Sequence, residues 1–442
     1  MSARTLFRCN KCSFSSPKWF GKCPSCGVWS SAAETAVVNG RRAAAPVAVS
    51  SLGAPAEEAV RFSSGSAEVD RVLGGGLVSG AVLLLAGEPG IGKSTLVLQL
   101  LDGIVAEGRR PLLVTGEESL GQVSLRAMRL GIDAARLRAL ASSSLEATLS
   151  AAADERPDVL VVDSIQTLHG ESAEHAPGSV VQVRDCSAAL IRYAKATGAV
   201  VVLVGHVTKD GSVAGPKTLE HLVDVVLALD GERTGTLRLL RSVKNRFGSC
   251  DETGVLTMGE NGLEPVPDPS ALLLADRREG VAGSVVFPSL EGTRPVLVEL
   301  QALVAKADTP QARRVAIGLD ARRVALLLGV LDGRAETSFA QQDVFSAAAG
   351  GIAVKEPAAD LALCLALHSA RHGRPVPDDL VAMGEIGLGG EVRRVPGVAR
   401  RLAEARRFGF RRALVPRGVE DVARGIEVTT VSDLATALSY CE

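Results

Sequence analysis

Short apolar segments recur along the middle of the chain and alternate with longer stretches of helix-forming residues. Between residues 61 and 265 these segments are rich in Val and Leu, and they read AVLLLA, PLLVT, DVLVVD, AVVVLVG, LVDVVLAL and TLRLL. Strands that are apolar on both faces are typical of parallel sheets, because crossover helices cover both sides. The pattern predicts an α/β domain with a largely parallel sheet, to which the last two segments add an antiparallel hairpin.

The same pattern divides the rest of the chain. A Pro-rich seam, EPVPDPS, follows this domain, and a second apolar α/β pattern begins at about residue 271. Residues 31–60 are rich in Ala, Ser, Pro and Gly and show no sustained periodicity, as in a linker. We therefore expect a compact unit at 1–30, a linker at 31–60, an α/β domain at 61–265 and a second α/β domain at 271–442.

Composition limits the partners that the protein can attract by charge and indicates its cellular compartment. The 442 residues include 49 basic and 50 acidic ones, so that any attraction to nucleic acid or membrane must come from a local patch. The longest apolar runs are far shorter than the ~20 residues that span a bilayer, and the N-terminus has no apolar signal-peptide core. Four of the eight cysteines are scattered singly, which fits a reducing compartment. We expect a cytoplasmic protein without membrane contact.

The first chemical signal is a pair of Cys-x2-Cys motifs in residues 1–30. Cys9 and Cys12 are followed, after ten residues, by Cys23 and Cys26. Four thiolates from two such turns satisfy tetrahedral Zn²⁺, and so small a unit needs a metal in order to fold. Two disulfides or free thiols are the alternative, which the reducing context disfavours. The sequence predicts a four-cysteine zinc ribbon.

Basic and aromatic residues crowd the same ribbon. They are Lys11, Lys18, Trp19, Phe20, Lys22 and Trp29. Such a surface suits stacked bases or a protein partner, but aromatic residues that cover a very small core would produce the same composition. The sequence leaves these readings open.

The second signal is GEPGIGKS, residues 87–94, which follows a predicted strand and precedes a predicted helix. This is the G-x-x-x-x-G-K-S pattern in the context that it requires. Backbone N–H groups of such a loop surround the β- and γ-phosphates of ATP, Lys93 bridges their oxygens and Ser94 holds Mg²⁺. The predicted nucleotide-binding residues are Gly87, Glu88, Pro89, Gly90, Ile91, Gly92, Lys93, Ser94 and Thr95.

Polar residues at the ends of other predicted strands complete the expected catalytic site. Asp163 ends DVLVVD and is placed to orient Mg²⁺ through its water shell, unless it is only a cap. Glu117 and Glu118 follow PLLVT, and one of them should polarise the attacking water; Glu117 is our candidate and Glu118 the alternative. His206 ends a third strand, where it would sense the γ-phosphate, although a lone His is more often structural.

These motifs, in this order, resemble the RadA (Sms) family of bacterial DNA-repair proteins. The matching segments are the four-cysteine ribbon, RFSSGSAEVDRVLGGGLVSGAVLLLAGEPGIGKST, TGEES, VVDSIQT and KNRFG, so the resemblance spans essentially the whole chain. It implies a RecA-like ATPase core that assembles as a homo-oligomeric, hexameric ring and resembles DnaB-type helicases. It further implies binding to single-stranded and branched DNA, branch migration during recombinational repair, and a RecA recombinase as partner.

The basic stretch RSVKNRFGSC follows the last apolar segment of the α/β domain. In RecA-type rings the nucleotide lies at a subunit edge, where a neighbouring subunit can supply cations to the γ-phosphate. Resemblance to DnaB-type helicases gives this role in trans to Lys244 and Arg246, which a turn at Gly248 would present outward. A solvated basic turn is the alternative.

Two loops rich in Gly, Ser and Pro directly follow the predicted nucleotide-sensing strands. They read QTLHGESAEHAPGSVVQVR and VTKDGSVAGPKTLEH, and we expect them to face the centre of the ring. Arg184, Lys209 and Lys217 would contact DNA phosphates there without reading bases. Polar loops without a function are the alternative.

The C-terminal domain resembles the Lon protease domain but lacks its Ser–Lys dyad. GGIAVKEPAADLALCLALHSA puts Ala358 at the position of the nucleophile, and GEIGLGGEVRRVPGVARRLAEA puts Ala399 at that of the lysine. A methyl group neither attacks a carbonyl nor accepts a proton, so we expect no peptidase activity. Residues 391–424 hold ten arginines against four acidic residues, which indicates either a DNA-facing patch or a solvated helix face.

Three functions are thus weighed: an ATP-driven motor on DNA, an ATP-dependent Lon-like protease and a KaiC-like regulatory ATPase. The missing dyad disfavours the protease. The zinc ribbon and KNRFG disfavour the third, for which a duplicated ATPase domain is expected. The preferred prediction is a DNA-dependent ATPase of recombinational repair that uses ATP, Mg²⁺ and Zn²⁺.

Overall fold

The computed structural model describes most of the chain, in two compact units. The described residues are 5–9, 11, 14–16, 18–30, 32–36, 60–170, 178–206, 217–231, 237–308, 311–418 and 425–441. The units are Met1–Glu58 and Ala59–Glu442. Within the described part, no helix is both long and apolar enough to cross a bilayer.

The first unit is a small antiparallel sheet of three strands in the order β2 (Ser15–Ser16), β1 (Thr5–Cys9) and β3 (Ala32–Ala36). All five residues of β3 pair with β1. The boundary that we expected at residue 30 is therefore too early. An Ala-rich strand has little hydrophobic alternation, and its backbone ladder, which composition does not reveal, attaches it to the ribbon.

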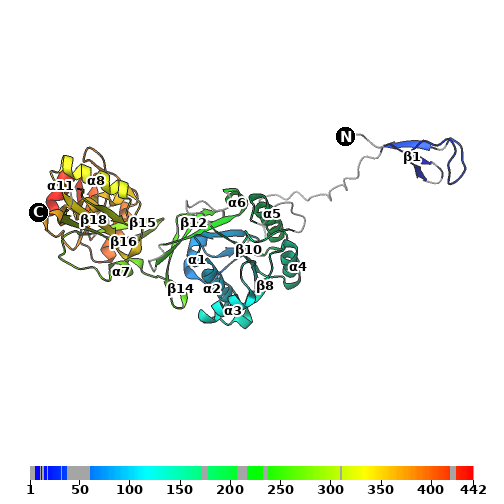
Figure 1. Ribbon diagram of the computed structural model, residues 1–442, viewed down its shortest axis with the longest axis horizontal. Helices are drawn as coiled ribbons and strands as arrows, with labels where there is room; N and C mark the ends of the chain where they lie inside the picture. The colour runs from blue at the N-terminus through cyan, green and yellow to red at the C-terminus, as the bar shows by residue number, and fades with distance from the viewer. Residues whose placement is uncertain are drawn as a thin grey trace. The chain divides into compact units, whose positions relative to one another are not determined.

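A nine-stranded sheet organises the predicted α/β domain of the second unit (Figure 1). Its order is β14 (Gly262–Pro265), β13 (Thr253–Gly259), β12 (Leu237–Asn245), β11 (Val225–Asp230), β6 (Val82–Gly87), β10 (Val200–His206), β9 (Val159–Asp163), β7 (Pro111–Thr115) and β8 (Arg138–Ala141). The strands from β11 to β8 are parallel, whereas β12, β13 and β14 are antiparallel additions. The expected hairpin is thus present, but its first strand, β11, pairs in parallel with β6.

Both faces of this sheet are apolar and are covered by helices (Figure 1). Leu83 and Leu85 of β6 pack on one side with α1 (Ala67–Leu73), α2 (Lys93–Ala106) and α3 (Leu120–Arg129). Leu84 and Val201 pack on the other side with α4 (Leu145–Glu155), α5 (Val180–Thr197) and α6 (Lys217–Leu222). Successive side chains of a strand point to opposite faces, which explains the continuous apolar runs in the sequence. A short hairpin of β4 (Arg61–Phe62) and β5 (Leu77–Val78) flanks α1.

The C-terminal domain is built on a mixed sheet of seven strands. Their order is β17 (Arg314–Ile317), β18 (Gln342–Ala348), β16 (Arg294–Lys306), β15 (Ser284–Glu291), β19 (Leu380–Ala382), β22 (Arg412–Pro416) and β23 (Glu427–Val431). A separate pair joins β20 (Glu385–Ile386) to β21 (Val392–Arg393). The helices are α7 (Pro269–Leu274), α8 (Ala321–Arg334), α9 (Asp360–His372), α10 (Val398–Arg407) and α11 (Leu434–Leu438).

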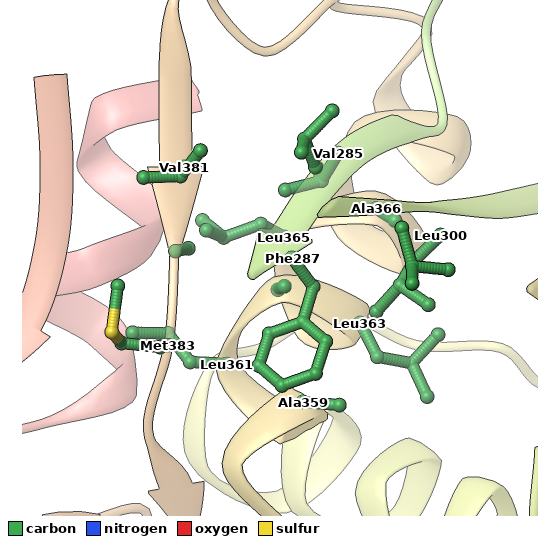
Figure 2. Packing of buried hydrophobic residues seen from close by; sticks show 14 of the residues in the cluster. Val285, Phe287, Leu300, Ala359, Leu361, Leu363, Leu365, Ala366, Val381 and Met383 are labelled. Atoms are coloured by element: carbon green, nitrogen blue, oxygen red, sulfur yellow. The ribbon is translucent and has the colours of Figure 1, made fainter. Parts of the chain in front are cut away.

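Helix α9 forms the centre of this domain. Every residue from 360 to 367 is buried, as is typical of a helix that is enclosed on all sides. Figure 2 shows the ring of Phe287, from β15, among Ala359, Leu361 and Leu363. The predicted fold class, a P-loop α/β core with a small ribbon and a second α/β domain, is confirmed.

Charged contacts connect the two α/β domains within the second unit. Arg294 of β16 pairs with Glu68 of α1 at 2.8 Å, and Arg241 of β12 pairs with Glu291 of β15 at 2.6 Å. Glu68 and Glu291 are buried. Because one buried partner comes from each domain, separating the domains would expose or unpair these carboxylates.

Candidate nucleotide-binding site and zinc ribbon

The P-loop connects the end of β6 to the start of α2 and holds Lys93 in a buried position. Only 5% of Lys93 is exposed, and its Nζ donates to the carbonyl oxygens of Gly87 at 2.9 Å and Glu88 at 3.0 Å. Burial lowers the pKa of Lys93, while Asp163 and Glu117 nearby act in the opposite direction. The lysine that should meet phosphate is thus desolvated and faces two carboxylates.

Glycine is required at Gly92, the residue before α2. Its φ of 117° lies in the left-handed region, and a Cβ atom there would lie 2.7 Å from Cε of Met258. At Gly90, also left-handed, an added Cβ would meet no atom within 4 Å. The loop is therefore packed tightly where it enters the helix and open at its tip.

Ser94 and Asp163 meet at the carboxyl edge of the sheet. The Ser94 hydroxyl donates to Oδ2 of Asp163 at 2.8 Å, although the two residues are 69 positions apart in the chain. Hydroxyl and carboxylate oxygens are ligands that Mg²⁺ accepts, directly or through its water shell. The Ser94–Asp163 pair therefore suits the Mg²⁺ that accompanies a bound nucleotide.

The structure separates the two candidate bases. The Ser164 hydroxyl, next to Asp163, donates to Oε1 of Glu117 at 2.5 Å. The carboxylate of Glu118 instead accepts from Nη1 and Nη2 of Arg126 at 2.8 and 2.5 Å. Only Glu117 lies on the side of the P-loop.

Close packing at Gly116 fixes this arrangement. A Cβ atom at Gly116 would lie 2.1 Å from Oγ1 of Thr167, and the Gly116 N–H donates to the carbonyl of Asp163 at 2.9 Å. The segment after β7 can approach the end of β9 only because residue 116 has no side chain.

Strand register places His206 directly beside the P-loop. His206 of β10 is the pairing partner of Gly87 of β6. The His206 side chain lies outside the described residues, so its role as a γ-phosphate sensor stays a prediction.

Sequence reasoning missed Arg238, which supports the P-loop from β12. Its side chain is 6% exposed, and Nε donates to the carbonyl of Ile91 at 3.1 Å. The signal was the segment TLRLL, in which one cation interrupts an apolar strand. A cation in such a position requires a buried acceptor.

Three described cysteines of the ribbon converge as metal ligands do. The Sγ atoms of Cys9, Cys23 and Cys26 lie within 4.8 Å of one another, and those of Cys9 and Cys26 are 3.7 Å apart. The Lys11 N–H donates to Sγ of Cys9 at 3.5 Å, a contact that favours a thiolate. Cys12 lies outside the described residues. The three converging sulfurs fit tetrahedral Zn²⁺, with Cys12 as the expected fourth ligand.

Comparisons with known proteins agree with these sites. Family models match as an AAA domain over residues 49–212, a rubredoxin metal binding domain over 7–34 and a Lon protease (S16) C-terminal proteolytic domain over 332–436. Three relatives called "DNA repair protein RadA" come from Pseudomonas aeruginosa, Escherichia coli K12 and Bacillus subtilis 168. They are 47%, 45% and 44% identical to this chain over 99%, 99% and 98% of its length, and each alignment covers 98% of the relative.

The chain belongs to the RadA family. This confirms the resemblance that the motifs indicated, and the family models support an ATP-binding AAA domain and a zinc ribbon.

Within the chain, the KNRFG segment turns toward its own subunit. Nζ of Lys244 donates to the carbonyls of Glu220 and Val223, both at 2.7 Å, at the end of α6. Burial, and secondarily Arg246, lowers the pKa of Lys244. The expectation that Lys244 points outward is not met, because the unpaired carbonyls at a helix end attract a cation.

Arg246 is more exposed than Lys244. Its Nη1 lies 3.1 Å from Oδ1 of Asp224, a buried carboxylate that also pairs with Lys195 at 2.8 Å. The Arg246 side chain is nevertheless 56% exposed. It reaches the surface in a way that Lys244 does not.

The predicted DNA contacts are only partly visible. Arg184 is exposed on α5, with Nε 3.5 Å from Oδ1 of Asp185. Lys217 begins α6, but its side chain and the whole of Lys209 lie outside the described residues. Their role in DNA binding stays a prediction.

In the Lon-like domain, the two alanines at the dyad positions differ in environment. Ala358 is buried, and its carbonyl accepts from the Gly384 N–H at 2.8 Å, whereas Ala399 is exposed on α10. Neither side chain has a group that can attack or accept a proton.

The arginines of residues 391–424 do not form one uniform patch. Arg401 is fully buried and bonds Glu356 at 2.5 Å and the Pro288 carbonyl at 2.6 Å. Arg407 pairs with Asp268 at 2.6 Å, and Arg412 pairs with Asp379. Charge that looked available for DNA is in part used inside the chain, because an arginine fork matches a carboxylate.

Proposed function

We propose that this RadA-family chain is a DNA-dependent ATPase that drives branch migration in recombinational repair as a ring-shaped, DnaB-like motor. The observation that carries the proposal is the convergence of Lys93, the Ser94–Asp163 pair and Glu117 at one edge of the sheet. The process is taken from the relatives, which are called DNA repair protein RadA.

In this proposal hydrolysis begins with phosphate bound at the P-loop. Lys93 exchanges its two backbone carbonyls for oxygens of the β- and γ-phosphates, whose charge it offsets inside a desolvated site. Ser94 and Asp163 would hold Mg²⁺, which supplies charge stabilisation at the same oxygens. Glu117 orients and deprotonates the attacking water.

The missing cations come from a neighbouring subunit. Arg246 is the exposed partner of the buried Asp224, and Lys195 stays paired with that carboxylate when Arg246 leaves. Lys244 must leave two short bonds to α6, so its engagement would also release the end of α6. Supply in trans would link hydrolysis in one subunit to the position of α6 in the next.

DNA would pass through a hexameric ring, as single-stranded or branched DNA on which a RecA recombinase also works. Arg184, Lys209 and Lys217 are the proposed phosphate contacts. Such contacts hold DNA of any sequence, as a translocating motor requires.

The Lon-like domain serves assembly and DNA binding without peptidase chemistry. A methyl group at residues 358 and 399 leaves neither nucleophile nor base. No observation on the described residues favours the protease or the KaiC-like alternative over the motor.

The test is binding of the purified chain to a single-stranded oligonucleotide across a salt series, with and without ATP. We expect affinity to fall linearly with salt on logarithmic axes, at about 0.7 per phosphate contact, and the slope to change when ATP is added. Lys93→Ala should retain binding without the change caused by ATP. Affinity that is independent of both salt and nucleotide would refute the proposal.

A further inference from the structure

Both tryptophans of the chain lie on the zinc ribbon and are largely exposed. Trp19 is 65% exposed and Trp29 is 70% exposed, and the chain contains no other tryptophan. Large exposed aromatic side chains commonly mark a contact surface. Phe14 and Phe20 contact edge to face with ring centroids 5.9 Å apart, and both are less exposed than the two tryptophans.

Both indoles lie close to Gly21. A Cβ atom built on Gly21 would lie 3.5 Å from Cη2 of Trp19 and 3.9 Å from Cζ3 of Trp29. Residue 29 is held by a β-bridge to Lys22, and the Ser30 N–H donates to the Gly21 carbonyl at 2.8 Å. The backbone thus brings two aromatic rings to one point, with no side chain between them at residue 21.

The surroundings of this pair are positive. Nζ of Lys22 lies 5.8 Å from the ring centroid of Trp29, and Lys11 and Lys18 are exposed on the same ribbon. The sequence has no Asp or Glu before Glu34. The basic side chains of this stretch therefore attract a polyanion, and no acidic side chain in it repels one.

We propose that Trp19 and Trp29 form a stacking site for an unpaired base of single-stranded DNA, with Lys22 contacting a neighbouring phosphate. Every base has an aromatic face, so such a site tolerates any sequence, and only an unstacked base can offer that face. Charge favours a nucleic acid over a neutral peptide. The inference rests on the proposed function in taking DNA as the ligand, and it adds a site separate from the ring loops.

The experiment uses tryptophan fluorescence of the full-length, zinc-loaded chain, because both tryptophans belong to the proposed site. Adding oligo(dT) should quench the emission, with or without ATP, whereas a duplex of equal length or an abasic strand should quench much less. Trp19→Ala and Trp29→Ala should each weaken strand binding by roughly 5- to 50-fold. Lys22→Ala should reduce the salt slope by roughly one phosphate contact.

Controls separate this site from folding and from the motor. Zinc content is measured for each variant, and Trp19→Phe, which keeps a ring, should recover most of the binding even if an alanine variant loses metal. Leu125→Ala, at a residue of α3 that is 65% exposed, should bind as the unaltered chain does.

Three outcomes overturn the inference. Emission that DNA does not change, while the chain still binds DNA in an ATP-dependent manner, would remove the stacking site, leave the motor in place and indicate that the tryptophans dock a protein. Equal quenching by abasic and normal strands would show phosphate contact without stacking. Absence of DNA binding in every nucleotide state would overturn the motor proposal as well.

Discussion

The P-loop domain and the Lon-like domain are both α/β structures with well-filled cores, yet they differ in what lies at the ends of their strands and helices. In the P-loop domain polar side chains from distant segments meet: Ser94 with Asp163, and Glu117 with Ser164. In the Lon-like domain the corresponding dyad positions carry alanine, at residues 358 and 399.

The buried cations of the two domains also differ in their partners. Lys93 is buried beside carboxylates and donates to two backbone carbonyls, which phosphate oxygens can replace as acceptors. Arg401 is also buried, but it donates to the Glu356 carboxylate and to the Pro288 carbonyl within the domain. The comparison shows that a shared α/β architecture does not determine chemistry. Chemistry depends on a few polar side chains whose contacts a ligand can replace.

The sharpest change to the P-loop domain is Lys93→Ala. It should reduce ATP hydrolysis by at least about 10³-fold, because the γ-phosphate charge loses its principal cation. Steady-state hydrolysis with single-stranded DNA present measures this. Lys306→Ala, at an exposed lysine of the Lon-like domain, is the matched control and should hydrolyse ATP normally. Equal rates for both variants would show that the site is misassigned.

The next prediction separates the two glutamates. Glu117→Gln should lower kcat by about 10²-fold or more with little change in KM for ATP, because the amide cannot accept the proton of water. Glu118→Gln is isosteric and should cost much less, since it weakens an ion pair with Arg126 outside the site. If the two variants exchanged these phenotypes, Glu118 would be the base.

In the Lon-like domain, charge should matter for stability and little for catalysis. Arg401→Ala leaves Glu356 partly buried without its partner and should lower the unfolding free energy by about 3–5 kcal/mol. Arg412→Ala removes a pair whose arginine is 45% exposed and should cost about 1 kcal/mol or less. Chemical denaturation of both variants measures the difference. Equal losses would mean that the burial of Arg401 does not decide its contribution.

The last prediction concerns peptidase activity, which we expect to be absent. The intact chain should not cleave casein with ATP, because residues 358 and 399 supply neither nucleophile nor base. Cleavage that persists through rigorous purification, and that Lys93→Ala abolishes, would show that the Lon-like domain has a different catalytic centre.

The sequence predicted most of what lies in the P-loop domain, for a physical reason. A buried parallel strand is a continuous apolar run, so its end is visible, and a polar residue at that end stands out. Asp163 and Glu117 are predicted as site residues in this way. Which of Glu117 and Glu118 faces the site depended on Gly116 packing against Thr167, a contact between distant segments that no local pattern records.

Elsewhere local patterns were less informative. β3 was assigned to the linker because Ala-rich strands have no marked alternation. The arginine count of residues 391–424 predicts an exposed patch or a solvated helix face, whereas Arg401 is a core residue, because a charge count does not report burial. Arg238 was overlooked although its apolar neighbours indicate burial. These failures share one cause, since each depends on a partner that is remote in sequence.

The most direct test of the central claim, that a neighbour's KNRFG segment completes the P-loop site, uses mixed assemblies. Arg246→Ala protomers keep an intact P-loop but lack the donor, whereas Lys93→Ala protomers keep the donor but lack the P-loop. Each variant alone should be inactive, and mixtures confirmed to contain both should recover part of the DNA-dependent ATP hydrolysis. Absence of recovery at every mixing ratio would contradict the account and leave Arg246 with the role that it has inside its own chain, as the partner of Asp224.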